Sequence, residues 1–139
     1  MNGKLESLIP VDYQTLQAGG QLIDLLYFIV SGTDGEFRRL HHKRLIQHYY
    51  DSFAGFLTKL GLDPEVVYPK RHFDEDYKEY LPFGLILAMF ILPIVLVESE
   101  NAPTMEGDAK ITDMLIKPND VAHKRFLEVV ENYVNWGVL

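Results

Sequence analysis

Apolar and polar positions recur along this chain at spacings that predict mostly helices. The run Gln21–Ser31, "QLIDLLYFIVS", predicts a short buried helix. Thr33 followed by Glu36 forms a capping box that would open a second, longer helix, which Gly61 would end. The apolar positions at near-helical spacing in this second helix are Phe37, Leu40, Leu45, Tyr49, Phe53, Phe56 and Leu60.

The C-terminal half of the chain also predicts two helices, after a connector over residues 62–73. Asp74 is the expected N-cap of a helix that leads into the apolar run Leu81–Val97. Residues 98–120 are polar and predict a loop. Asp120 is the expected N-cap of a last helix, Val121–Trp136, which Gly137 would close.

The run Leu81–Val97, "LPFGLILAMFILPIVLV", contains no charge and has two interpretations. A fully buried core helix and a membrane span both show apolar residues on every side. The run is at the short end of the length that a spanning helix needs, and it is flanked by glutamates rather than by lysine or arginine. These features favour the buried core helix.

The N-terminal segment shows a different pattern. Asn2-Gly3 is a hairpin-turn signal, and Lys4–Tyr13 after it predicts a β-strand that Pro10 places at a sheet edge or bulge. A strand that pairs through this turn would have to precede Met1, so we expect an upstream partner. The chain shows no internal repeat and no break in composition, so the sequence predicts a single structural unit over residues 1–139.

Composition narrows the class of protein. The chain has 139 residues, of which 47% are hydrophobic, and a net charge of −7 from 13 basic and 20 acidic residues. These values indicate a globular domain and argue against a nucleic-acid partner, which favours basic surfaces. The sequence contains no cysteine, so disulfides and thiolate metal sites are excluded. We expect no membrane partner and a cytoplasmic location.

Standard catalytic motifs are absent, and the histidines give a weak signal. His41 and His48 lie two helical turns apart with His42 adjacent, whereas metal-binding pairs on helices sit four residues apart. We therefore interpret "RRLHHKR" as a solvated basic face. The doublet Tyr49-Tyr50 indicates helix packing rather than stacking on a ligand.

Asp12 is the strongest candidate for chemistry. It ends the apolar run of the predicted strand and precedes a glycine-containing loop, an arrangement that can hold Mg²⁺ with phosphate oxygens. A strand-terminal aspartate is more often a turn former, so spacing alone favours that alternative.

Two motifs resemble the signature of the ecdysteroid kinase-like, or CHK kinase-like, family of the choline kinase and aminoglycoside phosphotransferase superfamily. The first is "VDYQ", with Tyr13 where the family usually has phenylalanine, and the second is "DLLYF", Asp24 to Phe28. The segments "EFRRLHHKRLIQHYYDSFAGFLTKLGLDP", "FGLILAMFILPIVL" and "RFLEVVENYVNWGVL" extend the resemblance over nearly the whole chain except residues 98–120.

The resemblance implies the helical C-terminal lobe of a protein-kinase-like fold, with a short N-terminal strand or hairpin remnant. It implies an ATP-dependent phosphotransferase acting on a small hydroxylated acceptor, sterol-like or amino-alcohol-like, with ATP and Mg²⁺ as cofactors. Asp12 would bind the Mg²⁺ that bridges the nucleotide phosphates. Asp24 would support the site by capping its helix and anchoring the catalytic loop, although a plain N-cap explains it almost as well.

The sequence also departs from the family pattern. The ATP-binding lysine lobe and the His-Gly-Asp catalytic loop precede the Asp-Phe-Gln strand in the family, and no residue before Asp12 supplies them. We therefore expect a partial kinase that is inactive alone. The alternative is a non-catalytic helical binding or scaffold protein of the same origin. In both cases exposed apolar surface would favour self-association.

Overall fold

The chain forms a mainly α-helical domain in the computed structural model, which describes residues 6, 7, 9, 20–98, 100 and 117–139. The helices are α1 (Gln21–Gly32), α2 (Gly35–Lys59), α3 (Pro64–Val67), α4 (Lys70–Val95) and α5 (Asp120–Asn135). The mainly helical prediction is confirmed. No strand occurs among the described residues, and nearly all of the predicted strand Lys4–Tyr13 lies outside them, as does most of the loop over residues 98–120.

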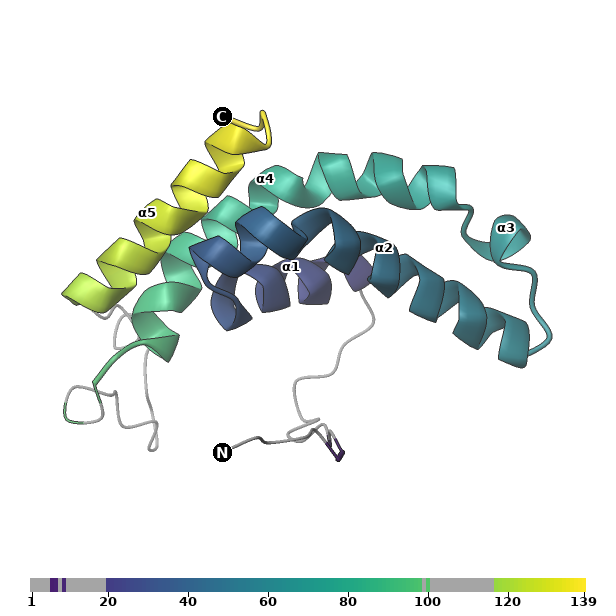
Figure 1. The fold of residues 1–139 in the computed structure, drawn as a ribbon, viewed down its shortest axis with the longest axis horizontal. Coiled ribbons are helices and arrows are strands. Elements are labelled where there is room, and N and C mark those ends of the chain that lie inside the picture. The colour runs from purple at the N-terminus through teal and green to yellow at the C-terminus, as the bar shows by residue number, and fades with distance from the viewer. Residues whose placement is uncertain (1–5, 8, 10–19, 99, 101–116) are drawn as a thin grey trace, which may run out of the picture.

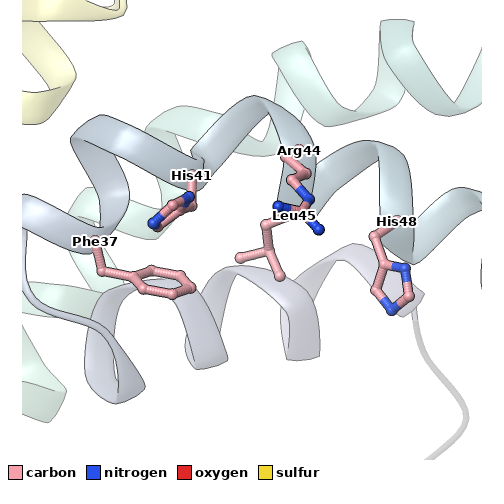
Figure 2. A pocket seen from close by; sticks show the side chains of 5 residues that line it. All are labelled: Phe37, His41, Arg44, Leu45 and His48. Carbon is pink, nitrogen blue, oxygen red and sulfur yellow. The ribbon is translucent and has the colours of Figure 1, made fainter.

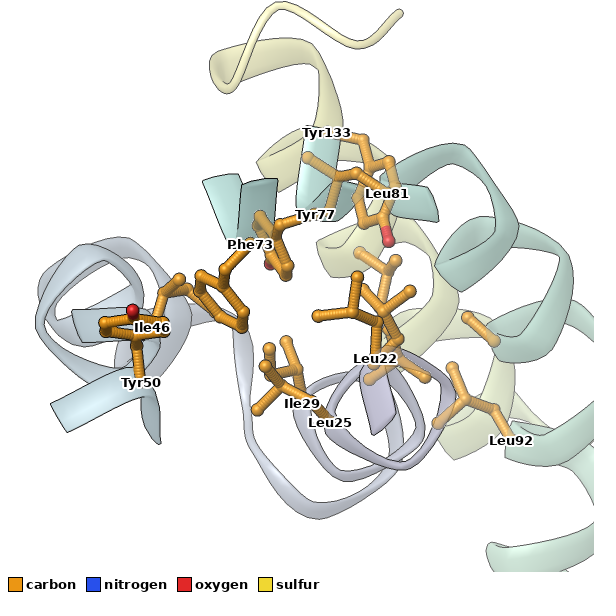
Figure 3. Packing of buried hydrophobic residues seen from close by; sticks show 14 residues of the cluster. Leu22, Leu25, Ile29, Ile46, Tyr50, Phe73, Tyr77, Leu81, Leu92 and Tyr133 are labelled. Atoms are coloured by element: carbon orange, nitrogen blue, oxygen red, sulfur yellow. The ribbon is translucent and has the colours of Figure 1, made fainter. Parts of the chain in front are cut away.

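The other helices are arranged around the long helix α4 (Figure 1). Helix α1 packs along one side of α4, and α5 crosses it. The first half of α2 lies between α1 and α5, and its second half extends away toward α3. Apolar side chains from α1, α2, α4 and α5 meet in one core (Figure 3). Burying these side chains is the main stabilising contribution to such a fold. The most deeply buried apolar members of the core are Leu26, Ile29, Val30, Phe73, Ala88, Leu92, Val129 and Tyr133.

The crossing of α4 and α5 depends on a glycine. A Cβ atom added to Gly84 would lie 2.2 Å from Tyr133 Oη and 3.3 Å from Leu26 Cδ2. The Tyr133 hydroxyl is buried and has no hydrogen-bond partner among the described residues. Burial raises the pKa of this hydroxyl, so it remains protonated.

We expect Gly84→Ala to lower the free energy of unfolding by about 1–3 kcal/mol, because overpacking at Tyr133 outweighs the better helix propensity of alanine. Tyr133→Phe should cost little, since it removes a buried hydroxyl that lacks a partner. In the double variant the Gly84→Ala penalty should shrink. Denaturant unfolding of the unsubstituted protein, the two single variants and the double variant measures this coupling. If the free-energy changes of the two single substitutions simply add in the double variant, the packing of Gly84 against Tyr133 is contradicted.

Two glycines end helices as predicted. Gly61 has φ 76° and Gly137 has φ 73°, conformations that glycine adopts without strain. The amide of Leu62 donates to the carbonyl of Leu57, and the amide of Val138 donates to that of Tyr133, each over 3.0 Å. Both helices therefore finish in a Schellman motif.

The predicted helix starts are wrong by one or more residues. Asp34 caps α2 in place of Thr33, and its side chain accepts a hydrogen bond from the amide of Phe37. Asn119 caps α5 in place of Asp120. In both cases two adjacent residues could serve as the cap, and the tertiary contacts of each helix select one.

Asp74 is not an N-cap either, because α4 starts earlier, with Pro69 at its N-cap position. Asp74 instead forms an ion pair with Lys70 one turn before it. The Lys70 ammonium also lies 5.2 Å from the centroid of the Phe73 ring, in cation–π geometry. These contacts stabilise the first turn without a side-chain cap.

The prediction that Leu81–Val97 is fully buried is wrong for the described residues. Only one stripe of the helix is buried, comprising Leu81, Gly84, Ala88 and Leu92, because α1 and α5 cover one face. By length and composition α4 could cross a membrane, a test that core helices of soluble proteins also pass. Its opposite face exposes large apolar side chains, namely Phe83, Ile86, Met89, Phe90, Ile94 and Val95.

Candidate functional site

The sequence analysis singled out two carboxylates, Asp12 and Asp24, and the structure describes only the second. Asp12 lies outside the described residues, so its role as a metal ligand stays a prediction. Asp24 is exposed in the first turn of α1, where Gly20 occupies the N-cap position. The N-cap role of Asp24 is therefore wrong, because α1 starts three residues earlier, at Gln21. A carboxylate in the first turn still interacts favourably with the helix dipole.

Asp24 lies beside the middle of α2. The Tyr49 hydroxyl donates a 3.3 Å hydrogen bond to the carbonyl of Gln21. Burial, and then the negative charge of Asp24, raise the pKa of Tyr49. The start of α1 is thus held against α2, and the Asp24 side chain remains accessible to solvent.

A hollow of about 340 Å³ lies on α2 where this helix faces α1. Figure 2 shows its lining, which comes from one side of α2: Phe37, His41, Arg44, Leu45 and His48. The rings of Phe37 and His41 lie 5.0 Å apart. The predicted solvated basic face "RRLHHKR" is confirmed for its exposed members Arg39, His41, Lys43 and Arg44.

The chemistry of this hollow suits an organic ligand better than a metal ion. His41 and His48 are seven residues apart, which places them about 10 Å apart along the helix axis. No group of three or more histidine, aspartate or glutamate side chains that could hold a metal ion occurs in the described part of the chain. Arg44 supplies a permanent positive charge beside the apolar Phe37 and Leu45. This combination can bind an apolar molecule that carries hydroxyl or anionic oxygens.

Arg38 has a role that the sequence analysis missed. Its side chain is only 1% exposed, and it joins α2 to both neighbouring segments. Its Nε donates to Asn132 Oδ1 over 2.7 Å, and its Nη1 donates to the carbonyl of Thr33. Arg125 Nη2 donates to the same carbonyl over 2.9 Å. Burial, and then the charge of Arg125, lower the pKa of Arg38. The two arginines fix the junction of α1 and α2 against α5.

Glu128 completes this junction at the start of α2. Its Oε2 accepts a 3.1 Å hydrogen bond from the amide of Gly35, the first residue of the helix. A carboxylate at this position satisfies an amide that has no partner within the helix and interacts favourably with its dipole. A Cβ atom on Gly35 would lie 2.9 Å from Glu128 Cβ, so the close approach requires glycine.

His42, like Arg38, does not belong to the solvated basic face predicted for "RRLHHKR". Its ring stacks on Trp136 with centroids 3.8 Å apart and planes inclined by 15°. It also shares a 2.7 Å hydrogen bond with the Tyr77 hydroxyl. Burial, followed by the charges of Lys43 and Arg38, lowers the pKa of His42 to about 4. The imidazole is therefore neutral at physiological pH and links α2, α4 and α5.

The buried face of α2 differs from the face predicted from its apolar residues. Phe37, Leu40, Phe56 and Leu60 are exposed, whereas the buried residues are Gly35, Arg38, Ile46, Tyr50 and Leu57. The spacing of Gly35, Arg38, His42, Ile46 and Tyr50 by three or four residues was the available signal. It was missed because two members carry polar side chains. The interpretation of Tyr50 as a packing residue is confirmed, since the centroids of the Tyr50 and Phe73 rings lie 5.2 Å apart.

The structure thus defines a helical domain with a basic, aromatic-lined surface on α2. Residues 1–62 match the sequence model of the Ecdysteroid kinase-like family. This match confirms the resemblance over that stretch, which contains Asp12, Asp24, α1 and α2. No curated protein and no solved structure matches the chain.

Proposed function

We propose that this chain forms the acceptor-side part of an ATP-dependent kinase that phosphorylates a hydroxyl group of a small molecule. The acceptor would be sterol-like or amino-alcohol-like. The match of residues 1–62 to the Ecdysteroid kinase-like family carries this proposal. The helices α1 and α2, which follow the "VDYQ" motif, supply the scaffold on which such a site would be built.

In this proposal Asp12 would hold a Mg²⁺ ion at the phosphates of ATP. The acceptor hydroxyl attacks the γ-phosphorus and loses its proton to a base, and the bond to the β-phosphate oxygen breaks to release ADP. The Mg²⁺ held by Asp12 would supply positive charge that offsets the negative charge of the transferred group and the leaving oxygen. The 139 residues contain no His-Gly-Asp sequence to supply the base.

The hollow lined by Phe37, Arg44 and His48 is our candidate for part of the acceptor surface. It combines an apolar floor with side chains that can donate hydrogen bonds to hydroxyl oxygens. It also lies where α2 faces α1 (Figure 2), and α1 begins nine residues after Asp12 in the sequence.

We expect the 139-residue chain alone to transfer no phosphate from ATP to a sterol or amino alcohol, because positioned nucleotide, metal and base are all required. A chimera in which the nucleotide-binding lobe and catalytic loop of an ecdysteroid kinase-like protein precede residue 1 should transfer phosphate. A coupled assay of ADP release measures both proteins. An inactive but folded chimera, tested over a panel of sterols and amino alcohols, would overturn the proposal, and so would an active 139-residue chain.

A second candidate is a non-catalytic binding or scaffold protein derived from the same fold. The observation that favours it is the exposed apolar face of α4, which includes Phe83, Met89 and Phe90. The coding sequence upstream of Met1 discriminates the two candidates: an in-frame His-Gly-Asp followed by asparagine supports the kinase.

A further inference from the structure

A second hollow, of about 520 Å³, lies between the first half of α2 and the end of α5. This volume is in the range of small-molecule sites. We call it the α2–α5 cleft, and its lining consists of Arg39, Leu40, His42, Lys43, Asn132, Asn135 and Trp136. It lies on a different side of α2 from the hollow that contains Arg44.

The lining of the α2–α5 cleft carries positive charge and no acidic side chain, although the whole chain has a net charge of −7. Arg39 and Lys43 are four residues apart on α2, so their side chains are neighbours. The one ion pair of Arg39 among the described residues is a long contact of 3.9 Å with Glu36, and both side chains are largely exposed. Such a pair holds Arg39 weakly.

Buried groups behind the wall hold one side of the cleft in place. Asn132 is only 4% exposed, and Arg38 holds its carboxamide in place through the 2.7 Å hydrogen bond to Oδ1. The Nη2 of Arg38 is buried and has no hydrogen-bond partner in the described part of the chain. The carboxylates of Glu128 and Asp34 act on the Arg38 guanidinium and offset part of its charge, so the positive charge of the cleft rests on Arg39 and Lys43.

The other wall is rigid and aromatic. Trp136 stacks on the neutral ring of His42, and it also contacts Tyr133 with ring centroids 5.1 Å apart. The indole Nε1–H and the Asn135 carboxamide can donate hydrogen bonds at this wall, and Leu40 adds an apolar contact. Donors and positive charges on a preformed surface select an oxyanion.

We propose that the α2–α5 cleft binds a phosphate group, either free or as the phosphomonoester of a small molecule. Arg39 and Lys43 would contact the phosphate oxygens, and Leu40 and Trp136 would contact the organic part of an ester. This proposal does not depend on phosphoryl transfer, so it is tested on the 139-residue chain without ATP or Mg²⁺.

Trp136 provides the readout because it is the single tryptophan of the sequence. Inorganic phosphate and butyl phosphate are titrated separately at constant ionic strength, and tryptophan fluorescence is recorded. We expect a saturable change below about 10 mM of ligand, the range of weak small-anion binding. Equal affinities would indicate a site for the phosphate group alone, and tighter binding of butyl phosphate would indicate a phosphomonoester site.

Lys43→Gln and Lys59→Gln form a matched pair for this test. Both replace one exposed lysine on α2 by glutamine, but only Lys43 lines the α2–α5 cleft, whereas Lys59 lies in the last turn of the helix. We expect Lys43→Gln to weaken binding tenfold or more and Lys59→Gln to change it less than twofold. Absence of a saturable response to both probes would overturn the proposal. An equal effect of the two substitutions would also overturn it, because it would indicate unspecific attraction to the surface.

Discussion

Arg38→Met is expected to lower the free energy of unfolding by about 2–4 kcal/mol, because a buried acceptor that loses a charged donor costs on the order of 1–3 kcal/mol. The methionine keeps much of the apolar volume of the arginine stem. It leaves Asn132 Oδ1 without its donor, and it leaves the carbonyl of Thr33 with Arg125 alone. Urea unfolding followed by circular dichroism measures the loss.

Arg39→Met is the matched control, since the two arginines are adjacent and the substitution is the same. The Arg39 side chain is 62% exposed, and its one ion pair in the described part of the chain is the 3.9 Å contact with Glu36. We expect a change within about 0.5 kcal/mol, as is usual for surface positions. Equal effects of the two substitutions would contradict the buried position of Arg38 and the orientation of α2.

Asp12→Asn is expected to lower the turnover of the chimeric kinase by about 10²–10³-fold, the scale for losing one key electrostatic group. Asparagine keeps the size of the side chain but removes the charge that would hold Mg²⁺. The thermal midpoint should change little. Turnover measured against Mg²⁺ and Mn²⁺ concentration should show partial rescue by excess metal.

Asp24→Asn in the same chimera is the control for Asp12→Asn. It removes the same carboxylate charge at a position that is not proposed to bind the metal. Asp24 is exposed in the first turn of α1 and is not the N-cap, so its replacement should leave helix stability nearly unchanged. A fall in turnover at this position would indicate the proposed anchoring of the catalytic loop. Near-normal turnover of Asp12→Asn at limiting Mg²⁺ would instead show that Asp12 is a turn residue.

The sequence predicted the helices well because their signals are local. A run of apolar residues identifies α1 and α4, and glycine at a helix end identifies the last residues of α2 and α5. Each signal depends on a few neighbouring residues and on backbone preferences that act in any tertiary setting. Exact helix starts were less predictable, because at Thr33-Asp34 and at Asn119-Asp120 two neighbouring side chains can both cap.

The candidate sites were predictable only in part. The family motif that includes Asp12 is a sequence feature, and its match needs no coordinates. The α2–α5 cleft joins residues about ninety positions apart in the chain, such as Lys43 and Asn132. No local pattern contains such a pair, so this cleft could not be predicted from spacing.

The basic stretch of α2 shows what the sequence alone determined and what the tertiary structure decided. The sequence by itself determined that "RRLHHKR" is helical and rich in positive charge, because helix propensity and charge belong to individual residues. Only the tertiary structure decided that Arg38 is buried and His42 half-buried while Arg39 and His41 remain in solvent. The physical reason is that α5 presents Asn132 and Trp136 to one face of α2. These partners compensate the burial of polar groups there, and no such compensation can be seen in the sequence of α2 alone.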